Sequence, residues 1–137
     1  MHIGPSDGPG GMSSIIRNLL AEMPEGWSGD CINTFSANGI FSKILTFSSA
    51  RNRVKDVVRR ELVDIAHIHV SHGFSWWRKL WFVRFFRRHD VPVIIHIHSG
   101  RFEKFCSGSS GSVVKKVLSD VGVQCVVLER RWLEKLS

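Results

Sequence analysis

Short apolar runs alternate along this chain with longer segments in which apolar residues recur every three or four positions. The short runs predict five strands, at residues 2–4, 31–35, 64–70, 92–98 and 123–128. The longer segments predict helices at residues 12–22, 49–62, 74–88 and 113–119, and a further helix from residue 129 onward. Residues 36–47 stay unassigned, and the Ser/Gly-rich stretch 107–112 predicts a loop.

The predicted strands are nearly continuous in valine and isoleucine and do not alternate apolar with polar residues. Strands of this kind are covered on both faces, as in sheets whose strands are linked by helices. A length of 137 residues fits one domain. We therefore predict a single Rossmann-like α/β domain over residues 1–137, a doubly wound parallel sheet of about five strands with helices on both faces.

Composition narrows the class of protein. No apolar run is long enough to span a bilayer, and the N-terminus begins with a strand and lacks a signal-peptide pattern. We therefore expect a cytoplasmic protein, with peripheral contact at the inner face of the membrane as an option. The three cysteines are widely spaced, which argues against a disulfide framework and a zinc ribbon.

The net charge of +7 is compatible with nucleic acid, an anionic membrane or a phosphorylated small molecule as partner. No recognisable nucleic-acid-binding module occurs in the sequence, so we expect no nucleic-acid partner. The charge alone does not choose between the other two.

A glycine-rich loop, residues 5–11, follows the first predicted strand and opens the first helix. Backbone amides at a helix N-terminus attract anions, and glycines allow a ligand to come close. The run Gly8-Pro9-Gly10-Gly11 lacks the lysine of a P-loop and the spacing of a dinucleotide fingerprint. A tight turn without a ligand explains the loop equally well.

Two predicted strands carry a His-x-His pattern, His67 with His69 and His96 with His98. Side chains two apart on a strand share a face, and ligands bind at the carboxyl ends of parallel strands. His69 and His98 are therefore the candidates for function, and His98 is the stronger. The deeper pair, His67 and His96, is expected to be core histidines with satisfied nitrogens.

Two His-x-His pairs also resemble parts of metallohydrolase sites, because zinc favours imidazole. Most such sites include carboxylate ligands as well. Glu103 is the only acidic residue near the fourth predicted strand, so we expect no bound metal.

The predicted helix at residues 74–88 interleaves aromatic and basic residues on more than one face. The commoner explanation is a helix packed on the sheet, with arginine stems covering its flank. The alternative is an interfacial helix on an anionic membrane, supported by the basic run 51–60. The membrane-surface candidates are Trp77, Arg78, Lys79, Trp81, Arg84, Arg87 and Arg88.

The order of several loose motifs resembles the N-terminal domain of family 4 glycosyltransferases, which have the GT-B fold. The matching pieces are residues 2–5 with Gly10-Gly11-Met12, the strands at 64–69 and 92–100, and residues 126–132. Together they span nearly the whole chain, and their order and spacing carry the resemblance.

The resemblance implies transfer of a sugar from a nucleotide-sugar donor to a hydroxyl, with retention of configuration and without a bound metal or other cofactor. It places Gly10 and Gly11 beside the donor diphosphate and His98 beside the sugar near its reacting carbon. Ser99 and Arg101 follow as donor-side candidates, and His69 is an acceptor-side candidate. The acceptor, a glycan or a lipid-linked molecule, is not identified.

In this family a second Rossmann-like domain supplies most of the nucleotide contacts, and the sequence stops at Ser137 before any such domain. We therefore expect a C-terminal GT-B domain in another chain or another segment, and a poor catalyst without it. The alternative function is a non-catalytic basic α/β module that binds a membrane surface or a protein partner.

Overall fold

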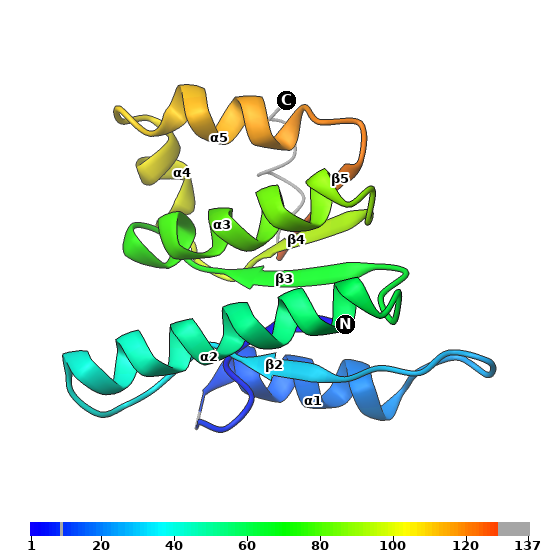
Figure 1. Ribbon diagram of the computed structural model, residues 1–137. Helices are drawn as coiled ribbons and strands as arrows, with labels where there is room; N and C mark the ends of the chain where they lie inside the picture. Colours follow the sequence, from blue (N-terminus) through cyan, green and yellow to red (C-terminus); the bar gives the residue numbers. More distant parts are fainter. Residues whose placement is uncertain (9, 129–137) are drawn as a thin grey trace. The chain divides into compact units, whose positions relative to one another are not determined.

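The chain folds as an α/β protein, described by a computed structural model for residues 1–8 and 10–128. Strands and helices alternate, and the five strands form one parallel sheet in the order β2-β1-β3-β4-β5 (Figure 1). The predicted Rossmann-like class, with five strands and intervening helices, is confirmed. The helix predicted from residue 129, and the part of the family motif at residues 129–132, lie outside the described residues. Contacts within the chain define two compact units, Met1–Ala66 and His67–Ser137.

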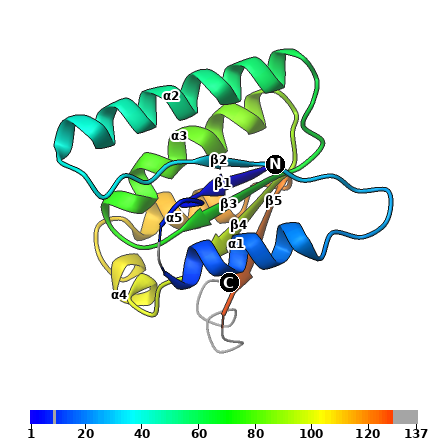
Figure 2. The ribbon, with the colours of Figure 1, turned by 90° about the horizontal axis from the view of Figure 1, so that it is seen from below.

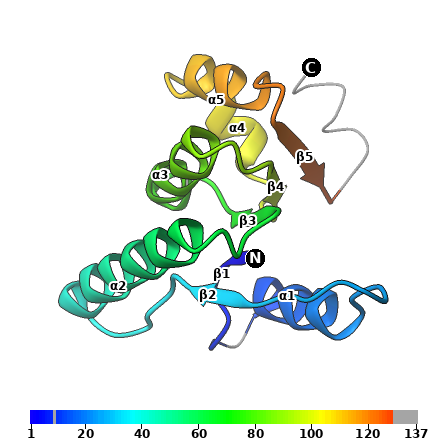
Figure 3. The same ribbon diagram turned by 45° about the vertical axis from the view of Figure 1, so that its right-hand side comes forward.

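The first unit contains β1 (His2–Gly4), α1 (Gly11–Ala21), β2 (Cys31–Asn33) and α2 (Ile40–Arg59). Strands β1 and β2 pair in parallel, in the register that sets Ile3 opposite Ile32. Helices α1 and α2 cover opposite faces of this strand pair (Figures 2 and 3). Apolar residues from all four elements are buried: Ile3, Ile16, Ile32, Ala50 and Val54.

The second unit contains β3, α3, β4, α4, α5 and β5. Their bounds are Ala66–Val70, Phe74–Arg88, Val93–Ile97, Phe102–Cys106, Gly111–Leu118 and Val123–Val127, with β3 beginning on the last residue of the first unit. Strands β4 and β5 pair in parallel over five residues. The core combines strand residues with one face of each helix and includes Ile68, Phe82, Phe86, Ile95, Ile97, Phe102 and Val114.

Two predicted elements, β1 and α3, begin and end at the residues that the pattern predicts. The second strand is two residues shorter than predicted and ends at Asn33. The side chain of Asn33 explains this end: its Oδ1 accepts a hydrogen bond from the amide of Phe35, two residues on, at 3.0 Å. Such a local bond turns the chain out of the strand.

The prediction is wrong in two places between strands. Helix α2 begins at Ile40, inside the unassigned stretch and nine residues before the predicted start at residue 49. The expected loop at 107–112 lies between two short helices, and α5 already begins at Gly111. A Cβ on Gly111 would lie 2.1 Å from the carbonyl oxygen of Cys106. The glycine therefore permits close contact between α4 and α5.

Candidate functional site

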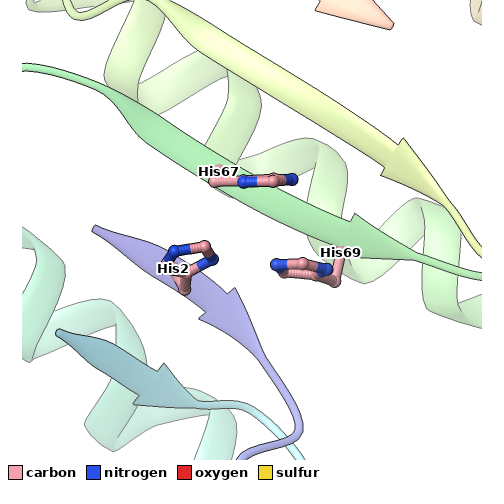
Figure 4. A group of neighbouring side chains, drawn as sticks. All are labelled: His2, His67 and His69. Carbon is pink, nitrogen blue, oxygen red and sulfur yellow. The ribbon is translucent and has the colours of Figure 1, made fainter. Parts of the chain in front are cut away.

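The imidazoles of β3 project from one face of the strand. His67 and His69 lie with their ring centroids 4.4 Å apart and nearly parallel (Figure 4). The residues that alternate with them, Ala66, Ile68 and Val70, are fully buried on the other face. The period of two along a strand therefore separates a histidine face from an apolar face, as the sequence predicts.

The imidazoles of β4 meet those of β3. His96 and the residue that follows the strand, His98, stack with centroids 4.1 Å apart. Nε2 of His67 lies 3.3 Å from Nδ1 of His96, and Nδ1 of His69 lies 2.8 Å from Nε2 of His98. His67, His69, His96 and His98 thus form one group of touching rings, called the four-histidine cluster below.

The expected burial of these histidines is half right. On β4 the deeper residue His96 is 8% exposed and His98 is only partly buried, as predicted. On β3 the prediction is wrong, because His69 is completely buried while His67 keeps some exposure. Nε2 of His67 and Nδ1 of His96 bond to each other, so the expectation of satisfied ring nitrogens is confirmed for these two atoms.

Burial favours the uncharged form of the two histidines at the end of β4. It lowers the pKa of His96, and it is the main reason why the pKa of His98 falls to about 4. The neighbouring His96 and the ammonium of Lys79 lower the pKa of His98 further. Neutral imidazoles carry one donor and one acceptor nitrogen each, which suits the two ring-to-ring hydrogen bonds.

Lys79 is a buried residue of α3, with 1% of its surface exposed. Its Nζ donates a hydrogen bond to the backbone oxygen of His69 at 3.2 Å. The prediction that Lys79 faces a membrane surface is therefore wrong, because its ammonium is buried inside the fold and donates to the backbone of β3.

A set of small polar groups follows the two histidine strands. Nδ1 of His72 lies 2.7 Å from Oγ of Ser99 and 3.2 Å from Oγ of Ser71. The amide of Arg101 donates to the same Ser99 oxygen at 3.3 Å, while the Arg101 side chain is exposed. The candidates His98, Ser99 and Arg101 thus lie within four residues just beyond the end of β4, with Gly100 between the last two. His72 was not predicted, although its place two residues after the end of the histidine strand β3 is a signal in the sequence.

The glycine loop belongs to the first unit. Gly10 has φ 141° and ψ 159°, a conformation that favours glycine, and Gly11 is the first residue of α1. The first helical hydrogen bond runs from the amide of Ser14 to the oxygen of Gly10, so the amides of residues 11–13 precede it. A Cβ on either glycine would meet no atom within 4 Å. The space on the side-chain side of both glycines is therefore open.

One face of α3 carries most of the remaining membrane-surface candidates. A groove of about 300 Å³ runs along it and is lined by Trp77, Leu80, Trp81, Arg84, Phe85 and Arg88. These positions recur at intervals of three and four, so they form one stripe. Arg78 is half-buried, and Arg87 is committed to a salt bridge with Asp120 at 3.0 Å.

The first half of α2 exposes a second apolar face that the sequence analysis left unassigned. Ile40, Phe41, Ile44 and Leu45 are between 59% and 81% exposed. Positions 40, 41, 44 and 45 lie on one side of a helix. Their side chains stand outside the core, which leaves an apolar surface on this unit.

Comparison of the chain with protein-family models, with curated proteins and with solved structures found no match. Within the part of the chain that the structure describes, no helix combines the length and apolar character needed to cross a membrane.

Proposed function

We propose that this chain is the N-terminal, acceptor-side domain of a retaining glycosyltransferase that uses a nucleotide-sugar donor. The observation that carries the proposal is the group of polar side chains at the carboxyl ends of β3 and β4. In open α/β sheets, ligands bind in the crevice outside the carboxyl ends of the parallel strands. The order of sequence motifs, which resembles family 4 glycosyltransferases, supplies the reaction class.

His98 has the properties needed to contact a sugar. Its imidazole is neutral near pH 7, because burial holds its pKa at about 4. Because Nε2 of His98 contacts His69, Nδ1 of His98 is the nitrogen left to bond a sugar hydroxyl, and a neutral ring does so without adding a charge. On this proposal Ser99 and the exposed guanidinium of Arg101 serve the donor side, and the completely buried His69 serves the acceptor side through its contact with His98.

The leaving group of such a reaction is a nucleoside diphosphate, which gains negative charge as the glycosidic bond breaks. Backbone amides aimed at developing charge lower the barrier because they need no reorganisation. We assign this role to the amides of Gly10 and Gly11 at the start of α1, where the space on the side-chain side of both glycines is open. A second Rossmann-like domain would provide the contacts to the nucleotide.

The experiment pairs the chain with a donor-binding domain encoded next to it, in the same or the adjacent reading frame. Transfer is measured with a panel of nucleotide sugars, and binding of each is followed by calorimetry. We expect the His98→Ala variant to lower kcat/KM by about two to three orders of magnitude, as expected for loss of a group that acts in the transition state.

His89→Ala is the matched control, because His89 is exposed and lies beyond the end of α3. It should leave transfer unchanged. Full activity of His98→Ala would remove His98 from the site. A pair that neither binds nor transfers any nucleotide sugar would overturn the proposal as a whole.

The second candidate function is a non-catalytic module on an anionic membrane. The aromatic and basic groove of α3 favours it, since Trp77 and Trp81 adjoin Arg84 and Arg88. Aromatic rings enter the headgroup region while arginines attract anionic lipid. The two functions are compatible, because membrane contact also suits an enzyme with a lipid-linked acceptor.

A further inference from the structure

Three imidazoles of the four-histidine cluster are close enough to share an ion. One ligand nitrogen from each of His69, His96 and His98 lies within 4.8 Å of the others. We propose that these three residues bind a late first-row divalent metal ion such as Zn²⁺, with His67 positioning His96. This proposal goes beyond sugar transfer and does not depend on it.

The ligand nitrogens must shift when an ion binds. Two nitrogens bound to one zinc at about 2.0–2.1 Å in a tetrahedral arrangement lie about 3.3 Å apart. The three ligand nitrogens lie within 4.8 Å of one another, and Nδ1 of His69 and Nε2 of His98 are 2.8 Å apart in a hydrogen bond. On binding, the ring that donates this hydrogen bond moves its proton to its other ring nitrogen, so both rings stay neutral and each gives a lone pair to the ion, and these two nitrogens separate by about half an ångström.

His67 provides the outer contact that such sites usually contain. A histidine that binds a metal commonly donates its other ring N–H to a fixed partner. Nδ1 of His96 and Nε2 of His67 form this contact at 3.3 Å. With Nδ1 of His96 as the donor, its Nε2 is left for the ion.

The chemistry of the site selects the metal. Imidazole ligands suit zinc, copper and nickel, whereas magnesium and calcium need oxygen ligands. Burial lowers the pKa of His96 and His98, which favours the neutral rings that can bind a metal ion. The positive charge of the buried Lys79 ammonium repels a metal ion bound at the cluster. We therefore expect the site to bind the metal ion with moderate affinity.

Three protein ligands leave the fourth tetrahedral position to water. That arrangement is typical of zinc sites that are open to a further ligand.

The test uses the purified chain without a histidine tag and without any sugar. Zn²⁺ binding is measured by calorimetry, and Co²⁺ binding by the visible absorption that distinguishes tetrahedral from octahedral coordination. We expect one ion per chain and a tetrahedral cobalt spectrum. His98→Ala and His69→Ala should weaken binding more than about 100-fold, and His67→Ala about 10-fold, as for an outer partner.

His89→Ala, which removes an exposed histidine outside the cluster, should bind as the wild type does. Circular dichroism checks the fold of each variant, and His98→Gln replaces His98→Ala if the latter is unfolded. Absence of saturable binding to the wild type, an octahedral cobalt spectrum, or unchanged affinity in a folded His98 variant would overturn the proposal. Each readout is independent of sugar transfer, so a failure here leaves the proposed function standing.

Discussion

His98 stands one residue beyond β4, where the surroundings of its ring decide its charge. Partial burial disfavours the imidazolium, and the nearby His96 and Lys79 disfavour it further, so its pKa falls to about 4. The neutral ring bonds to His69 at 2.8 Å. A hydrogen bond between two neutral imidazoles needs an unprotonated nitrogen on one side, so acid will disrupt the contact.

The lowered pKa of His98 predicts acid sensitivity. The unfolded chain takes up a proton on this residue near pH 6.5, and the folded chain does so near pH 4. Stability from this residue is therefore complete above about pH 6.5 and lost as the pH falls toward 4. The full shift corresponds to about 3.4 kcal/mol, and because the ring is only partly buried, solvent screening reduces the expected loss to about 2–3 kcal/mol. Urea unfolding at several pH values in chelator-treated buffer measures the slope. The slope should flatten in His98→Gln, and an unchanged slope in that variant would contradict the assignment.

The sequence predicts the shared face of each His-x-His pair because the period of a strand is two. It does not predict that His67 meets His96 and His69 meets His98, because pairing between strands depends on their register. The sequence also does not show that His69 is more buried than His67, where the prediction was wrong. A cluster built from two strands is therefore visible in the sequence only as two separate pairs.

At the scale of the element, α3 has apolar side chains on two faces with different surroundings. Trp76, Phe82 and Phe86 are buried in the core. Trp77 is 44% exposed and borders the groove with Trp81. Both explanations that the sequence left open therefore apply to α3. One face packs in the core, and the other is an exposed face of aromatic and basic residues.

If α3 contacts anionic lipid, charge reversal in its groove should weaken binding. We expect Arg84→Glu with Arg88→Glu to reduce the affinity for phosphatidylserine-containing vesicles by about 10- to 100-fold, from about 1 kcal/mol per basic residue. Binding should also fall as salt rises, because the attraction is screened. Vesicle sedimentation at several salt concentrations measures both effects.

The control carries the same change in net charge at two other exposed positions. Arg17→Glu with Lys104→Glu alters α1 and α4 and leaves the groove intact. It should keep most of the binding. Equal losses in both double variants would mean that total charge is responsible, and insensitivity to salt would favour a helix that serves packing alone.

Helix α2 is an example of an element whose existence was predicted correctly while its first residue was not. The periodic pattern marks a helix where its apolar residues reach the core, as at Val54. At its start, Ile40, Phe41 and Ile44 follow the same helical spacing but are exposed, so the sequence carried a signal for the earlier start that the prediction did not use. Helix α4 has five residues, too short to show a period.

At the scale of the whole molecule, the fold class follows from features that are repeated along the sequence. Five short apolar runs separated by helical segments allow few architectures other than a parallel α/β sheet. Function rests on a few side chains at strand ends, and these do not recur along the sequence. The sequence therefore predicts the fold closely and places His98, Ser99 and Arg101 beyond the end of a strand, while the contacts among the four histidines required coordinates.

Global stability should depend on burial far more than on hydrophobicity, and two phenylalanines allow a direct comparison. Phe82 is completely buried in the core of its unit, whereas Phe41 is 81% exposed. Phe82→Ala should lower the free energy of unfolding by about 3–5 kcal/mol, because it leaves a cavity as well as losing burial. Phe41→Ala should change it by less than about 0.5 kcal/mol.

Chemical denaturation followed by circular dichroism measures both changes. A typical domain is stable by only about 5–15 kcal/mol, so the Phe82 variant should have a far lower midpoint or be unfolded at the start. The same chemical change at Phe41 tests whether the exposed face of α2 belongs to the folded core. A loss at Phe41 comparable with that at Phe82 would show that this face is covered in solution by another part of the protein or by a second copy. A loss confined to Phe82 would leave the apolar end of α2 free for a partner.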